Sequence, residues 1–236
     1  MRITERQKLI LDRIIEEHVD LAQPISSQYL EGKYDFGVCP ATIRSEMQRL
    51  TNAGFLYQPH TSAGRVPTDK SYRFFVDSLL EKEISAFKDI FKIEEMLREE
   101  EEDVLKFVVH LSKFLATATS NLAAIHLLEK DLFWKEGWEE ILREPEFEEK
   151  DFIFDFAKLL KNFEKDIKDC KLNSEIKIYI GRENPFTRAK DFSIISAKCC
   201  FPDEEEGVIS LLGPKRMAYE RNIRLINSLA KILEEF

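Results

Sequence analysis

Cysteine is scarce in this chain, and its spacing matches no common metal-binding motif. The four cysteines are an adjacent pair, Cys199 and Cys200, and two isolated residues, Cys39 and Cys170. Zinc sites are typically built from Cys and His ligands a few residues apart, and no such spacing occurs here. We therefore expect reduced thiols, no metal and no cofactor.

Long apolar runs are also missing. Glu and Lys interrupt every hydrophobic stretch well before the roughly 20 residues that a membrane helix needs. Residues 1–10 lack the basic and then apolar pattern of a secretory signal. The sequence therefore predicts a cytoplasmic protein without a membrane partner.

Catalytic motifs are absent as well: the chain has no phosphate loop, dinucleotide-binding glycine pattern or Ser/His/Asp order. The acidic groups at Glu16, Glu17 and residues 99–102 lie in helical patterns and are expected to be surface charge. The turn at Gly213, followed by Lys215 and Arg216, could hold a ligand, although a strand-to-helix packing turn is favoured. The chain is therefore predicted not to be an enzyme.

Charge is unevenly distributed along a chain of globular composition. Of the 236 residues, 44% are hydrophobic and 33% charged, and the net charge is -9. Residues 1–80 carry ten basic and ten acidic side chains, so the later residues hold the whole acidic excess. If the partner is a nucleic acid, this later part would repel its phosphates and so help to orient the protein on it.

The N-terminal segment carries the signals of two helices. Thr4 and Gln7 form a capping-box pattern, and the apolar residues that follow have the helical period. Pro24 interrupts the chain, and Ser26 or Ser27 can cap a short second helix that ends near residue 33.

Residues 40–53 are the most informative segment. Pro40 suits a first helical turn, and Ile43, Met47 and Leu50 recur on one face. The opposite face carries Ala41, Ser45, Gln48 and Asn52, with Arg44 on one flank and Thr42 and Arg49 on the other. Such side chains can meet base edges and phosphates, as in the recognition helix of a helix-turn-helix.

A hairpin and a closing helix follow directly. Residues 55–57 and 65–67 are predicted strands joined by the loop 58–64, and a helix is expected from Pro67 to Leu80. Together these elements predict a winged helix-turn-helix domain over residues 1–80.

The remaining chain is predicted to be a helical segment followed by a mixed domain. Residues 81–128 have a long helical pattern and are interpreted as a linker that mediates dimerisation. Residues 129–236 show helices, strands at 175–180, 192–197 and 207–212, and a final helix from about Pro214 to Leu233. The fold class is therefore α+β, with a small antiparallel sheet in the C-terminal part.

Several segments closely match one family. The densest match is residues 58–70 with Tyr72 and Arg73, and others are residues 24–27, 41–44, 145–147, 179–181 with 183–185, and 213–220. On these residues the chain resembles the bacterial heat-inducible transcription repressor HrcA.

The resemblance implies a repressor that binds an inverted-repeat operator upstream of GroE and DnaK chaperone operons. It also implies a homodimer with a winged helix, a GAF-like domain and an inserted module that helps dimerisation, and a link to the GroEL chaperonin. Only about residues 129–144 stand where the family has a longer stretch, so the chain resembles a shortened member with a reduced GAF-like domain.

We expect double-stranded DNA to be contacted by two groups of residues. The helix supplies Thr42, Arg44, Ser45, Gln48 and Arg49, and the wing with its closing helix supplies His60, Ser62, Arg65, Lys70 and Arg73. Solvated surface charge is the alternative for Arg44 and Arg49, and His60 could instead stabilise the wing turn. A ligand-responsive regulator that uses the GAF-like domain as a sensor, and a winged-helix interaction adaptor, are the alternative functions.

Overall fold

The computed structural model describes residues 3–81, 103–167, 176–202 and 205–235, together with Phe91, Ile93, Glu95 and Arg98. The chain divides into two compact units, Met1–Lys82 and Glu83–Phe236. Much of the predicted linker, residues 82–102 apart from those four, lies outside the described residues, as do Cys170, Asp203 and Glu204.

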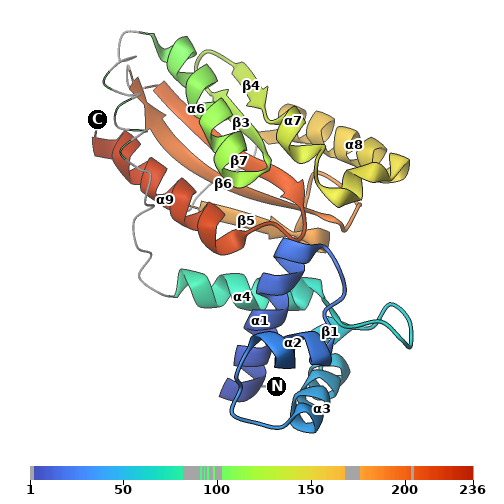
Figure 1. Cartoon of the computed structure of the whole chain (residues 1–236). Coiled ribbons are helices and arrows are strands. Elements are labelled where there is room, and N and C mark those ends of the chain that lie inside the picture. Colours follow the sequence, from blue (N-terminus) through green and yellow to red (C-terminus); the bar gives the residue numbers. More distant parts are fainter. Residues whose placement is uncertain are drawn as a thin grey trace. The chain divides into compact units, whose positions relative to one another are not determined.

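The first unit has the predicted order of helices and hairpin (Figure 1). Its elements are α1 (Glu5–Leu21), α2 (Ser27–Lys33), α3 (Pro40–Asn52), β1 (Leu56–Tyr57), β2 (Val66–Pro67) and α4 (Asp69–Leu80). Thr4 and Gln7 form the expected capping box, and the hydroxyl of Ser26 caps α2. The winged-helix prediction is confirmed.

The second unit is built on an antiparallel sheet of five described strands, in the order β4-β3-β7-β6-β5. The strands are β3 (Leu122–Leu127), β4 (Leu132–Glu136), β5 (Ile176–Ile180), β6 (Phe192–Phe201) and β7 (Glu205–Pro214). The helical elements are α6 (Val104–Thr119), α7 (Trp138–Ile141), η1 (Pro145–Glu148), α8 (Lys150–Asp166), η3 (Gly181–Glu183) and α9 (Tyr219–Glu235). The α+β prediction is confirmed.

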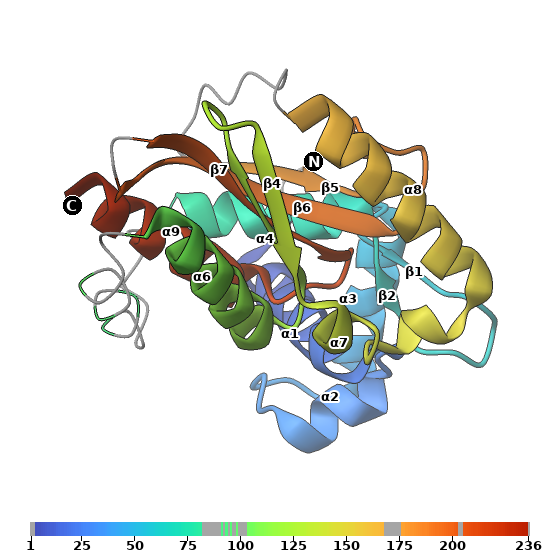
Figure 2. The same cartoon turned by 90° about the horizontal axis from the view of Figure 1, so that it is seen from above.

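Helices cover both faces of this sheet: α6 and α9 lie on one face and α8 on the other (Figures 1 and 2). Alternate strand residues point to opposite faces. The even-numbered Leu122, Ile194 and Leu212 therefore join Phe156 and Phe163 of α8 in one apolar cluster. Their odd-numbered neighbours are also buried, which explains why the central strands are apolar on both sides.

The helical prediction for residues 81–128 is wrong at its end. The helix α6 stops at Ser120, which has a left-handed φ of 55°, and β3 begins at Leu122. All six residues of β3 are buried, so the run has no alternation that would distinguish a strand from a buried helix. The strand β4 was also missed, and β7 continues to Pro214, so that the last helix begins at Tyr219.

The apolar stripe of α6 is not a free dimerisation surface. Phe107, Val108, Leu111 and Leu115 are fully buried, and α6 packs against β3 and β4 of its own unit. An apolar helical stripe has the same spacing whether it meets a sheet of its own chain or a second chain, so the sequence could not separate these cases.

Candidate nucleic-acid interface

The helix α3 has one buried and one exposed face. Ile43, Met47 and Leu50 are buried, as their spacing predicts, and α1 and α2 pack against this helix. The outward residues include Arg44, Ser45 and Gln48, all exposed. The first unit thus presents a rigid helix whose solvent face is rich in hydrogen-bonding side chains.

The predicted helix residues differ in how far their own chain engages them. The side chain of Arg44 makes no hydrogen bond or ion pair with any residue that the structure describes, so its guanidinium is available to an external partner. Thr42 is half-buried, and its Oγ1 lies 3.2 Å from Sγ of Cys39, a contact that lowers the pKa of this thiol. Arg49 is exposed but its Nη1 lies 3.1 Å from Oε1 of the buried Glu46.

The wing is held by its own hydrogen bonds. The amide of Gln58 donates to the carbonyl oxygens of Thr61 and Ala63, at 2.9 and 2.8 Å. The Ala63 N–H donates to the His60 carbonyl at 2.9 Å. His60 and Ser62 are exposed at the tip of this ordered loop, where they are free to meet a flat or grooved partner.

The Arg65 side chain, predicted to contact DNA from the wing, points toward α3 in the structure. Its Nε donates to Oγ1 of Thr51 and its Nη2 to Oε1 of Gln48, both at 3.0 Å. Its backbone pairs with Ile25 in an antiparallel bridge. The side chain therefore joins the base of the wing to α3, a contact that sequence spacing cannot reveal.

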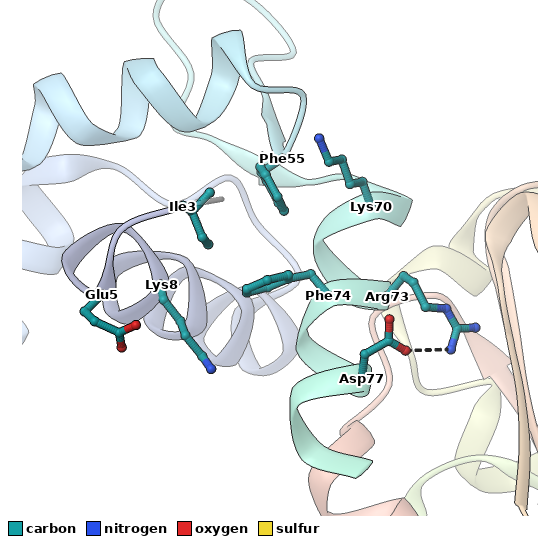
Figure 3. Close-up of a pocket in the computed structure, with 8 residues that line it drawn as sticks. All are labelled: Ile3, Glu5, Lys8, Phe55, Lys70, Arg73, Phe74 and Asp77. Atoms are coloured by element: carbon teal, nitrogen blue, oxygen red, sulfur yellow. Dashed lines mark hydrogen bonds and ion pairs between the residues drawn. The ribbon is translucent and has the colours of Figure 1, made fainter. Parts of the chain in front are cut away.

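Lys70 and Arg73 lie at the edge of a shallow pocket in the first unit (Figure 3). Nζ of Lys70 donates to the carbonyl oxygen of Ala53 at 2.8 Å, just past the end of α3, and lies 4.3 Å from the ring centre of Phe55. Arg73 faces Asp77, with 3.4 Å between Nη1 and Oδ1. Both cations therefore have partners within the chain, and Lys70 stabilises the last turn of α3.

A buried carboxylate was missed by the sequence interpretation. Glu17, expected on the surface, is only 2% exposed, and its carboxylate accepts hydrogen bonds from the Tyr29 and Tyr34 hydroxyls and from Nζ of Lys33. Burial opposes its ionisation, but the hydrogen bonds from Lys33 and the two tyrosines outweigh this effect and lower its pKa. The carboxylate ties α1 to α2 and to the start of the following loop.

We predict that Glu17→Gln destabilises the first unit by about 1–3 kcal/mol near pH 7, because charge-assisted hydrogen bonds become neutral ones. The folded-state pKa of Glu17 lies below its ordinary value of 4.5. The carboxylate therefore stabilises the fold above about that pH, and this contribution is lost as the pH falls through the lowered pKa.

Hydrogen exchange of α1 and α2 amides in the full chain measures this effect. The matched control is Glu16→Gln, because Glu16 is half-exposed and its ion pair with Arg13 lies on the same surface. Equal protection in the two variants at pH 7 would contradict the assigned role of Glu17.

Within the described ranges, no group of three or more His, Cys, Asp and Glu side chains is placed to hold a metal. The same part of the chain contains no helix with the length and apolarity required to cross a membrane. What the first unit does present is an exposed polar helix face beside an ordered hairpin. These features define it as a winged helix-turn-helix domain, a class that commonly binds duplex DNA.

A family model described as the HrcA protein C-terminal domain matches residues 68–223. The chain belongs to the HrcA family. A heat-inducible transcription repressor HrcA from Thermodesulfovibrio yellowstonii is 28% identical over 341 positions, which cover 98% of this chain and 97% of the relative. One from Desulfitobacterium hafniense is 41% identical over 121 residues, covering 50% of this chain and 34% of the relative.

A solved structure described as a hypothetical protein shares the fold. It has a TM-score of 0.75 and 19% identity, with 99% of this chain and 98% of the other chain covered. The alignment with the Thermodesulfovibrio relative extends over 341 positions, whereas this chain has 236 residues. A large segment of that relative therefore has no counterpart here.

Proposed function

We propose that this protein is a DNA-binding transcriptional repressor of heat-shock chaperone operons of the GroE and DnaK type. Membership of the HrcA family supports this proposal, because relatives carry the name heat-inducible transcription repressor. The observation that carries it for this chain is the exposed set Arg44, Ser45 and Gln48 beside an ordered wing. An interaction adaptor that had lost DNA binding would have no need of this set.

In this proposal α3 enters the major groove. Arg44, Ser45 and Gln48 meet base edges, while Thr42 and Arg49 lie at the flanks, nearer the phosphates. His60 and Ser62 at the wing tip approach the flanking backbone or minor groove, with Arg65 at the base of the wing. Lys70 and Arg73 would contribute phosphate contacts by exchanging or sharing their internal partners.

The proposed operator is an inverted repeat bound by a homodimer. One helix-turn-helix contacts few base pairs, so two copies related by a two-fold axis are needed for a specific site. If residues 81–128 mediate dimerisation, as predicted, the interface would be formed by residues outside the buried apolar stripe of α6. Coupling to the GroEL chaperonin is proposed from the family resemblance alone.

A small-molecule sensor is less well supported by the second unit. Aromatic side chains pack between α8 and the sheet: Phe147, Phe156, Phe163, Phe186 and Phe192 are all buried in one cluster. Their packing fills this region with hydrophobic core. We therefore prefer the repressor to a sensor of small molecules.

We predict that Arg44→Ala lowers the preference for the operator over scrambled DNA. The decrease is about 5- to 150-fold if the Arg44 guanidinium donates to both O6 and N7 of a guanine. Arg73→Ala is predicted to lower affinity for both DNAs equally and to reduce the salt slope by about 1. Titrations of both duplexes over a salt series measure these quantities. Equal losses on both DNAs in both variants would contradict the division into base and phosphate contacts.

A further inference from the structure

The Gln48 side chain lies between two polar partners on the exposed face of the first unit. Its Oε1 accepts a hydrogen bond from Nη2 of Arg65, and its Nε2 donates to Oδ1 of Asn52, each at 3.0 Å. A solvent-exposed glutamine on a helix ordinarily samples several rotamers and both amide orientations. Here both ends of the amide are held.

The Arg65 side chain is itself fixed in place. Its Nε donates to Oγ1 of Thr51, which in turn donates to the Met47 carbonyl at 2.9 Å. Its backbone N–H and carbonyl pair with Ile25 at 2.7 and 2.9 Å. The guanidinium therefore approaches Gln48 from a defined direction, and only a donor faces the amide at that end.

This arrangement selects one orientation of the Gln48 amide. If the amide were turned over, its Nε2 would face the Arg65 guanidinium, and two donors would meet. Arg65 thus favours the orientation with Oε1 toward the wing, and Asn52 accepts from Nε2 on the other side. The orientation is set before any partner binds, which reduces the entropy lost on binding.

The hydrogen-bonding groups that remain match one base. An amide oxygen can accept two hydrogen bonds and an amide nitrogen can donate two, so Gln48 retains one acceptor and one donor. Adenine presents an N6 donor and an N7 acceptor in the major groove, whereas guanine presents two acceptors there. The acceptor and the donor that Gln48 retains can together satisfy both groups of adenine but only one of guanine.

We propose that Gln48 recognises an adenine in the major groove and that Arg65 is a positioning residue, which acts through Gln48 instead of binding a phosphate. The inference rests on the proposed DNA-binding function and adds the identity of the base that Gln48 recognises. It also assigns the wing a role in base recognition, because the orienting group of Gln48 comes from the wing.

The test begins by selecting duplexes from a random pool with the full chain, so that no operator sequence is assumed. Each adenine of the selected site is then replaced singly by 7-deazaadenine, which lacks N7, and in a second series by guanine within a G·C pair. For the wild type we expect one adenine per half-site at which either replacement lowers affinity about 5- to 150-fold.

Three variants assign the effect, and a fourth, Arg65→Gln, tests whether Arg65 contacts a phosphate. The quantity compared is the ratio of the affinity for the selected duplex to the affinity for the duplex with that adenine replaced. In Gln48→Ala this ratio should approach 1. Arg65→Lys keeps the charge but cannot contact Thr51 and Gln48 together, and it should reduce the ratio at the same adenine at least threefold. The matched control Arg13→Lys changes an arginine of α1 that pairs with Glu16 and is not a proposed DNA contact, and it should leave the ratio unchanged.

The outcomes separate this inference from the function on which it rests. Failure of the pool to yield any enriched sequence would overturn the proposed function. An enriched site at which Gln48→Ala keeps every adenine dependence, or at which Arg65→Lys keeps the wild-type ratio, would overturn the inference alone. A full ratio in Arg65→Gln with a salt slope lowered by about 1 would identify Arg65 as a phosphate contact and would equally overturn it.

Discussion

Replacement of Gly64 by alanine is expected to lower operator affinity about tenfold to a hundredfold while the helices of the first unit stay folded. A Cβ at this position would lie 2.4 Å from the carbonyl carbon of Ile25, 2.5 Å from its oxygen and 2.7 Å from the carbonyl oxygen of Pro24. These are backbone atoms of a bridge, so they cannot move aside as a flexible side chain would. Overpacking of this kind costs about 1–3 kcal/mol.

The effect reaches the interface because Gly64 precedes Arg65. If the wing moves away from Ile25 to relieve the contact, the antiparallel bridge between Ile25 and Arg65 is lost and the guanidinium leaves Gln48. Titration of the selected duplex measures the change, and circular dichroism checks that helix content is kept. The matched control is Gly32→Ala in α2, where an added Cβ meets nothing within 4 Å. Equal affinity of the Gly64 and Gly32 variants would show that the wing does not take part in binding.

Removal of the Arg216 side chain is expected to have the largest effect on the stability of the second unit. Its Nε and Nη2 donate to the two carboxylate oxygens of Glu146, at 2.6 and 2.8 Å, and Nη2 also contacts Glu144. The residue is 8% exposed, so Arg216→Ala leaves two partly buried carboxylates without their cation. Breaking such a pair from one side typically costs about 3–5 kcal/mol.

Tryptophan fluorescence during urea unfolding isolates this effect, because both tryptophans of the chain, Trp134 and Trp138, lie in the second unit. Arg224→Ala serves as the control, since Arg224 forms an exposed pair with Glu220 one turn away on α9 and should cost less than about 1 kcal/mol. If the two arginine variants unfolded at the same urea concentration, the buried ion pair would not be the stabilising contact that its geometry indicates.

The part of the site that depends on periodicity could be predicted from the sequence. The burial of Ile43, Met47 and Leu50 places Arg44, Ser45 and Gln48 on the solvent face of a regular helix, and the helical repeat alone determines this arrangement. The capping residues of the first two helices follow for the same reason, because a cap is a local signal.

The contacts that join distant segments could not be predicted. Arg65 reaches Gln48 across 17 residues, and Glu17 meets Tyr34 across the same separation. The partners of Arg65 and Glu17 are set by the tertiary fold, and local sequence patterns carry no information about them. Glu17 also shows why charge patterns mislead, since an acidic residue next to Glu16 is buried once tyrosines and a lysine surround it.

The second unit was harder to predict because its strands are buried on both faces. Residues 122–127 follow a helix and are uniformly apolar, and they form a strand that pairs with β4 and β7. The departure from the helix is visible only in the turn at Ser120. A pattern without alternation leaves helix and strand equally compatible with the sequence.

The most direct test of operator-specific DNA binding uses the full chain and three duplexes of equal length. Fluorescence anisotropy measures the affinity for each duplex over a salt series. The first carries the inverted repeat upstream of a GroE-type operon of the same genome, the second one half-site, and the third a scrambled sequence. We expect the full repeat to be bound about a thousandfold or more tightly than the scrambled duplex, with the half-site between them. Equal affinity for all three duplexes at every salt concentration would contradict operator-specific binding.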